Sequence, residues 1–291
     1  MTAESPGRPE VVYRHRLPVR LTHWLNVVCL IFLLMSGLQI FNAHPALYWG
    51  QKGAETDQPW LKIGAVMTMD GLKGSTVIAG KRFYTTGVLG VSQENGGVAL
   101  KAWPAWATVP SWRDLAIGRR WHFFFAWLFV LNVLLYMIWG FASRHVQKDL
   151  APERKEWGQI GRSIVDHIKL KHPKGEAAKR YNVLQKVSYL AVVFAFLPLM
   201  MLTGLTMSPG VNAALPWMLD LFGGRQSARS IHFIVAWLIV LFVIVHLVEV
   251  VLAGPLNELR SMITGRYKVP PDPHAPEPLA PEPLTEEAGR G

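Results

Sequence analysis

Long apolar stretches alternate with polar segments along this chain and predict four membrane-spanning helices. The stretches cover residues 21–41, 119–141, 182–206 and 227–252. At a rise of about 1.5 Å per residue, each can cross a hydrocarbon core about 30 Å thick. The predicted fold is an all-α integral membrane protein, a four-helix bundle with its membrane domain at 21–265.

The polar segments between the stretches differ in composition. They are an N-terminus at 1–20, a segment rich in Gly, Pro and Trp at 42–118, a basic loop at 143–181 and a Pro-rich tail at 266–291. In the second segment, β-branched and aromatic runs at Ser75–Ile78 and Phe83–Leu89 predict a small hairpin. In the loop, Trp157–Leu170 has the pattern of a basic amphipathic helix lying on the membrane, and the tail is expected to be disordered.

Charge predicts the orientation of the helices. The loop 143–181 holds ten Lys and Arg against five acids, so the positive-inside rule assigns it to the cytoplasm. Four spans then put both termini in the cytoplasm of a bacterial inner membrane and segment 42–118 in the periplasm. The first apolar stretch lacks a small-residue cleavage site after it and is expected to stay uncleaved. The net charge of +10 therefore reflects topology and not nucleic-acid binding.

Composition limits the chemistry. The chain of 291 residues is 51% hydrophobic and has one cysteine, Cys29. This excludes a disulfide framework, a Cys-rich zinc or iron–sulfur site and covalent haem attachment through C-x-x-C-H. Because no acid–base pair or nucleophile constellation is recognisable, we expect no catalytic residues and an electron-transfer subunit, not a catalyst on its own.

The fourth apolar stretch carries two histidines, His232 and His246, where ionisable side chains are expensive. Fourteen residues at about 100° each return to within about 40° of the starting direction, about 21 Å further along the helix. Both side chains therefore face the same neighbours at different depths. Neutral imidazole is a good axial ligand for haem iron, so the pair predicts b-type haem; hydrogen bonds to neighbouring helices are the alternative.

A repeated pattern supplies the partner ligands. R-x-x-H-F-x-x-A-W occurs at 119–127 and again at 229–237, in two helices that enter from the same face. His122 is therefore expected at the depth of His232, and His23, in a helix entering from the opposite face, at the depth of His246. The prediction is two haem b groups, with His122 and His232 at the periplasmic side and His23 and His246 at the cytoplasmic side.

Arginines precede three of these histidines by three residues. Arg20, Arg119 and Arg229 are candidates to pair with haem propionates, with contact to lipid headgroups as the alternative. Gly37 lies 14 residues after His23 and faces the periplasmic haem, where its missing side chain would leave room for the ring or let helices pack closely.

With this pattern the chain resembles the di-haem cytochrome b subunits of respiratory formate dehydrogenases and nickel–iron hydrogenases, most closely the thiosulfate-reductase-type group. The resemblance covers about residues 14–265. It is carried by the four histidines with Leu21-Thr22-His23-Trp24, Arg120-Trp121-His122-Phe123, Tyr181-Asn182-Val183-Leu184-Gln185-Lys186 and Thr203-Gly204-Leu205-Thr206-Met207-Ser208. Segment 42–118 is much longer than its counterpart in the formate dehydrogenase subunits.

The resemblance implies electron transfer in a respiratory chain, between a quinone (ubiquinone or menaquinone) at the cytoplasmic haem and a periplasmic iron–sulfur or molybdopterin oxidoreductase. It places Asn182 and Gln185 at the quinone; helix capping by Asn182 with a solvated Gln185 is the alternative. Two rival functions stay open. One is a self-sufficient di-haem quinone reductase that oxidises a small donor such as superoxide, and the other is a transporter whose histidines bind protons or metal.

Overall fold

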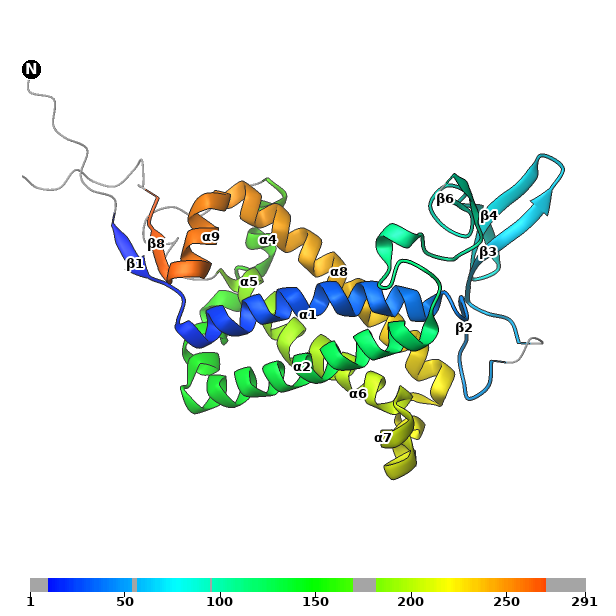
Figure 1. The fold of residues 1–291 in the computed structure, drawn as a ribbon. Coiled ribbons are helices and arrows are strands. Elements are labelled where there is room, and N and C mark those ends of the chain that lie inside the picture. The colour runs from blue at the N-terminus through cyan, green and yellow to red at the C-terminus, as the bar shows by residue number, and fades with distance from the viewer. Residues whose placement is uncertain (1–9, 54–56, 95, 170–181, 271–291) are drawn as a thin grey trace, which may run out of the picture.

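The computed structural model describes residues 10–53, 57–94, 96–169 and 182–270. Four helices in this part of the chain are long and apolar enough to cross a membrane. They are α1 (Leu17–Phe41), α2 (Leu115–Ala142), the continuous Val183–Met207 and α8 (Arg225–Ala253). The third combines α5 (Val183–Ala191), a π-helical turn (Val192–Phe196) and α6 (Leu197–Met207). In Figure 1, α1 and α2 run side by side and α8 passes behind them.

The four helices confirm the four predicted stretches; the first, second and fourth are longer than their apolar runs, and the third has the same length one residue later. Helix α1 begins at Leu17, four residues before the predicted apolar stretch; Pro18, with its fixed φ, lies in the first turn. Helix α2 begins at Leu115 because the Asp114 carboxylate accepts a hydrogen bond from the Ile117 N–H at 2.9 Å.

The two ends of the described chain meet at one end of the bundle. Strand β1 (Val11–Tyr13) pairs antiparallel with β8 (Arg266–Lys268), next to α9 (Pro255–Thr264) (Figure 1). We call this the terminal end. The predicted disordered tail is therefore wrong at its first residues, because 266–268 form a strand; residues 271–291 lie outside the described residues.

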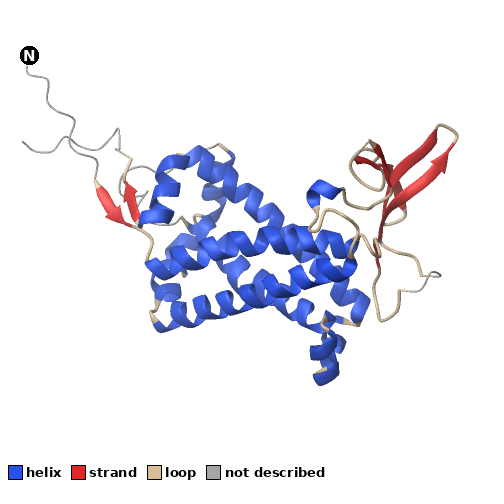
Figure 2. Ribbon diagram, in the orientation of Figure 1, coloured by secondary structure: helices blue, strands red, loops and turns tan. Residues whose placement is uncertain are grey.

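Segment 42–118 folds at the opposite end, which we call the sheet end (Figure 2). Its main sheet has the antiparallel order β2-β3-β4-β5. The strands are β2 (Ala46–Leu47), β3 (Leu61–Thr68), β4 (Gly71–Ile78) and β5 (Lys81–Tyr84), followed by the hairpin β6 (Ser92–Glu94) and β7 (Gly97–Ala99) and a 3-10 turn (Ala105–Ala107). The predicted hairpin is present as β4–β5, while the longer β3–β4 hairpin was not predicted.

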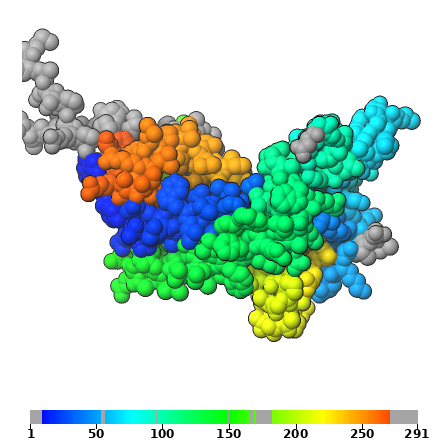
Figure 3. Space-filling view, in the orientation of Figure 1, coloured from blue at the N-terminus to red at the C-terminus, as the bar shows by residue number. Residues whose placement is uncertain are grey.

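Short helices fill the two other connections. The loop after α2 forms a π-helical turn (Val146–Leu150), α3 (Arg154–Trp157) and α4 (Ile160–Ile168), so the single predicted helix at 157–170 is shorter and starts later. The connection before α8 forms α7 (Pro209–Ala214) and a 3-10 helix (Pro216–Phe222). Helix α7 and this 3-10 helix form the yellow lobe that projects from the bundle in Figure 3.

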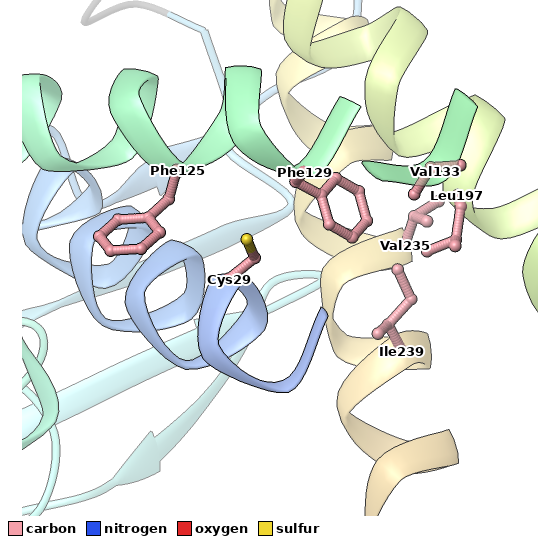
Figure 4. Close-up of a cluster of buried hydrophobic side chains, with 7 residues drawn as sticks. All are labelled: Cys29, Phe125, Phe129, Val133, Leu197, Val235 and Ile239. Carbon is pink, nitrogen blue, oxygen red and sulfur yellow. The ribbon is translucent and has the colours of Figure 1, made fainter. Parts of the chain in front are cut away.

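A cluster of buried apolar side chains holds the middle of the bundle together. It comprises Cys29, Phe125, Phe129, Val133, Leu197, Val235 and Ile239, contributed by all four spans (Figure 4). Buried Asn132 adds polar contacts between α2 and α1, donating to the Thr22 carbonyl at 2.9 Å and to Asn26 Oδ1 at 2.8 Å. These contacts fix the relative rotation of the two helices.

Candidate functional site

The four histidines singled out in the sequence lie in two pairs, each with one member on α8. His122 on α2 faces His232 near the sheet end, with ring centres 6.4 Å apart. His23 on α1 faces His246 near the terminal end, with ring centres 6.3 Å apart. The structure thus brings together the residues that the sequence paired. That they bind iron stays a prediction.

The spacing of both pairs suits one metal ion held between two imidazoles. A transition metal lies about 2.0–2.1 Å from a ligating nitrogen, and each ring nitrogen lies about 1.1 Å from its ring centre, so two imidazoles that held one metal ion from opposite sides would have centres about 6.3 Å apart. The observed distances agree with this value. The planes of the two rings are inclined by 64° in the His122 pair and 65° in the His23 pair.

Two ligands per site favour haem over a bare ion. Structural zinc takes four protein ligands and catalytic zinc three, whereas haem iron brings four ring nitrogens of its own. Among the described residues, no group of three or more His, Cys, Asp and Glu side chains could hold a metal ion. The donor set therefore fits a six-coordinate haem at each pair.

At the sheet end, neighbouring helices hold both imidazoles by their second nitrogen. Ser36 Oγ lies 3.1 Å from His122 Nδ1, and Thr203 Oγ1 lies 3.0 Å from His232 Nδ1. The glycine after each hydroxyl residue also contacts its histidine ring. A Cβ on Gly37 would lie 3.4 Å from His122 Cε1, and one on Gly204 would lie 3.3 Å from His232 Cε1.

The sequence reasoning assigned no role to Ser36, Thr203 or Gly204. A signal was present, because Ser36-Gly37-Leu38 in the first apolar stretch matches Thr203-Gly204-Leu205 in the third. Gly37 does lie beside a sheet-end histidine, where the sequence placed it.

At the terminal end the surroundings of the histidines differ. His23 Nδ1 is buried and has no hydrogen-bond partner within the described chain. His23 meets Trp24 edge to face at 5.3 Å, and His246 stacks on Phe242 at 6.1 Å. An unpartnered buried imidazole nitrogen is compatible with a ligand that is brought in from outside the chain.

The three candidate arginines contact other groups than those predicted. Arg229 donates to the Ala46 carbonyl at 3.0 Å and also to the His44 carbonyl, which fastens the start of α8 to β2. Arg20 donates to the carbonyl of Ile263 in α9. The Arg119 guanidinium lies 5.5 Å from the centre of the Phe123 ring. The propionate assignment of all three stays a prediction.

The two quinone candidates cap a helix. The Asn182 side chain accepts from the Gln185 N–H at 2.9 Å, and Gln185 Oε1 accepts from the Asn182 N–H at 3.2 Å, which forms a capping box. The alternative of capping by Asn182 is therefore observed, while Gln185 takes part in the cap instead of being solvated. Beside them, Lys186, only 8% exposed, pairs with Glu156 at 2.9 Å.

Two residues of the apolar cluster in Figure 4 lie between the two pairs along α8. On α8, Val235 and Ile239 lie between His232 and His246, which are about 21 Å apart along the helix. The bundle thus holds two pairs of facing imidazoles, one near each end, with buried apolar side chains between them.

Comparisons with known proteins gave matches to a family and to a curated relative. Residues 14–265 match a family described as prokaryotic cytochrome b561. A relative from Azospira oryzae, named putative protein-methionine-sulfoxide reductase subunit YedZ1, is 26% identical over 256 residues, covering 88% of this chain and 98% of its own length. No solved structure gave a significant match.

Proposed function

Because the chain belongs to the prokaryotic cytochrome b561 family, it is a bacterial membrane cytochrome that binds haem b and transfers electrons, and we propose that it holds two haem groups. His122 and His232 would ligate one iron, and His23 and His246 the other. Bound haem b supplies an iron centre that takes up and releases one electron at a time. The observation that carries the proposal is the 6.3 and 6.4 Å spacing of two imidazole pairs that share α8.

The bundle contributes position and environment. One rigid helix carries a ligand of each pair, so the separation of the two centres is built into α8. The cluster around Phe129 and Val235 keeps water out of the space between them. The protein's own part in the reaction is therefore to hold two redox centres in line across the membrane.

We further propose that the terminal end faces the cytoplasm and the sheet end the periplasm of an inner membrane. The ten Lys and Arg of loop 143–181 support this orientation. At the sheet end we propose docking of a periplasmic oxidoreductase, a molybdopterin enzyme or else an iron–sulfur protein. The relative from Azospira oryzae supports such an assembly, because its name makes it a subunit of a reductase.

At the terminal end we propose a quinone site beside the His23 and His246 pair. The capping box uses the carboxamide oxygens of Asn182 and Gln185, and the NH2 group of each can donate to a quinone carbonyl. The expected result of Gln185→Ala is slower haem reduction by quinol at unchanged haem content. Equal stopped-flow rates in the variant and the unchanged protein would remove this residue from the site.

Haem content tests the main proposal. We expect two b haems per purified chain in a pyridine haemochrome assay and a dithionite-reduced minus oxidised spectrum. His232→Ala and His246→Ala should each lose one haem, and each should lose a different one. His44→Ala, an exposed histidine outside both pairs, is the control and should keep two.

The outcomes separate the rival functions. A folded protein without visible absorption would contradict the haem assignment and support the transporter. Two haems whose reduction is driven by superoxide, without a partner protein, would support a self-sufficient quinone reductase instead of a subunit.

A further inference from the structure

The two sheet-end histidines are held in the same way by two different helices. Ser36 on α1 contacts His122 on α2, and Thr203 on α6 contacts His232 on α8. Both hydroxyl residues are fully buried in the bundle. Each also bonds a backbone carbonyl of its own helix.

Each hydroxyl has a single proton, and that proton is already used within its own helix. Ser36 Oγ donates to the Phe32 carbonyl at 2.5 Å, and Thr203 Oγ1 donates to the Leu199 carbonyl at 2.7 Å. With its proton on that carbonyl, each oxygen presents a lone pair to the imidazole Nδ1. This arrangement suits a hydrogen on Nδ1 of each histidine, which leaves the Nε2 lone pair for a metal.

The same unit occurs twice around this site. In one half, Ser36-Gly37 of α1 faces the R-x-x-H-F-x-x-A-W stretch of α2; in the other, Thr203-Gly204 of α6 faces the same pattern in α8. The nearly equal glycine-to-ring contacts of 3.4 and 3.3 Å extend the match beyond the hydroxyls. The two halves thus present equivalent ligands to one centre, while His23 lacks a hydrogen-bond partner for Nδ1 among the described residues.

We propose that Ser36 and Thr203 are positioning residues that hold His122 and His232 as Nδ1–H tautomers and lower the midpoint potential of the sheet-end haem. The inference rests on the proposed haem ligation. A hydrogen bond from Nδ1–H makes the imidazole a stronger electron donor, which stabilises the oxidised iron. Removing the acceptor raises the potential of this haem alone.

The test is a potentiometric titration of the purified holoprotein, in which the two haems are resolved by their midpoint potentials. Ser36→Ala and Thr203→Val remove one acceptor each, whereas Ser36→Thr and Thr203→Ser keep it. Thr206→Val is the matched control, a fully buried threonine on the same helix that donates to the Thr203 carbonyl at 2.7 Å.

We expect each variant without the hydroxyl to raise the reduced fraction of one haem, with about a tenfold larger reduced-to-oxidised ratio at fixed potential, or about 59 mV for one electron. The double variant should shift the same haem further, and the hydroxyl-keeping variants should not shift it. Loss of that haem in the acceptor-free variants, with retention in Ser36→Thr and Thr203→Ser, also supports the inference.

Two results overturn it. One is an unchanged pair of potentials in Ser36→Ala and Thr203→Val with two haems bound, which leaves the proposed function intact. The other is an equal shift or loss in Thr206→Val, which would show a general packing effect. Absence of two haems from the unchanged protein would instead contradict the proposed function itself.

Discussion

A methyl group added to Gly204 should weaken the binding of one haem. The new Cβ would lie 3.3 Å from His232 Cε1, whereas carbon atoms attract best at about 3.5–4.0 Å. The ring must therefore move by a few tenths of an ångström. Because ligands at a metal site lie within about ±0.2 Å of their usual distances, a shift of this size displaces His232 from a ligating position, and the larger side chain of Gly204→Val displaces it further.

The size of the effect follows from the cost of overpacking. Small-to-large changes in a packed core cost about 1–3 kcal/mol, which corresponds to about a 5- to 150-fold loss of haem affinity. Gly204→Ala should be at the lower end and Gly204→Val at or beyond the upper end. Alanine favours a helix over glycine by about 1 kcal/mol, so the helix itself is not weakened by the first change.

Transfer of haem to excess apomyoglobin in detergent measures this effect. We expect one of the two haems to leave faster in Gly204→Ala and to be missing from purified Gly204→Val, with the other unchanged. Gly161→Ala is the control, because a Cβ there meets nothing within 4 Å. Two haems with ordinary release rates in Gly204→Val would refute the close approach of this glycine to His232 as a proposed iron ligand.

Three further predictions concern the scaffold. Asn132→Leu removes two hydrogen bonds between α2 and α1 and should lower the free energy of unfolding in detergent by about 0.6–1.7 kcal/mol, measured by a denaturation titration with haem content as a second readout. Burial raises the pKa of Glu156, but the hydrogen bond and charge of Lys186, the Glu153 backbone hydrogen bond and the charge of Lys155 together outweigh it and hold the pKa below its usual range. Because the folded-state pKa of Glu156 is lowered, its ion pair with Lys186 stabilises the fold above about pH 4.3, the usual Glu value, and this stabilisation is lost as the pH falls through the folded-state pKa. The Trp157 fluorescence, measured as the difference in emission between the protein and Trp157→Phe, should report this loss. A pH-independent difference would contradict the prediction. Arg229→Gln should leave residues 44–46 more accessible to hydrogen exchange, because the two backbone carbonyls lose their donors; unchanged exchange would contradict this anchoring role.

The sequence alone predicts the membrane spans and the histidine pairs. Hydropathy identifies the four helices because the bilayer demands long apolar runs, and depth combined with helix periodicity places His122 opposite His232 and His23 opposite His246. These inferences need only the regular geometry of a helix. They therefore hold without knowledge of the packing.

The hydroxyls of Ser36 and Thr203 could not be assigned in the same way. In membrane helices, Ser and Thr commonly donate to the carbonyl four residues earlier, and such a bond gives no hint of a second contact. The arginine contacts and strand β8 were missed for a related reason. Arg229 donates to the carbonyls of His44 and Ala46, and β8 pairs with β1, only after segments far apart in the chain have come together.

The pairing of β1 with β8 has a consequence for biosynthesis. Strand β1 ends at Tyr13 and its partner begins at Arg266. At a translation rate of about 5–20 residues per second, β8 is therefore synthesised about 13–50 s after β1. By then all four membrane helices have been synthesised. The Trp24 indole N–H also donates to the Met262 carbonyl of α9, so α1 gains this contact only after α9 has been synthesised. A chain that ends before Met262 and β8 lacks both contacts. The fold at the terminal end therefore depends on the synthesis of these residues.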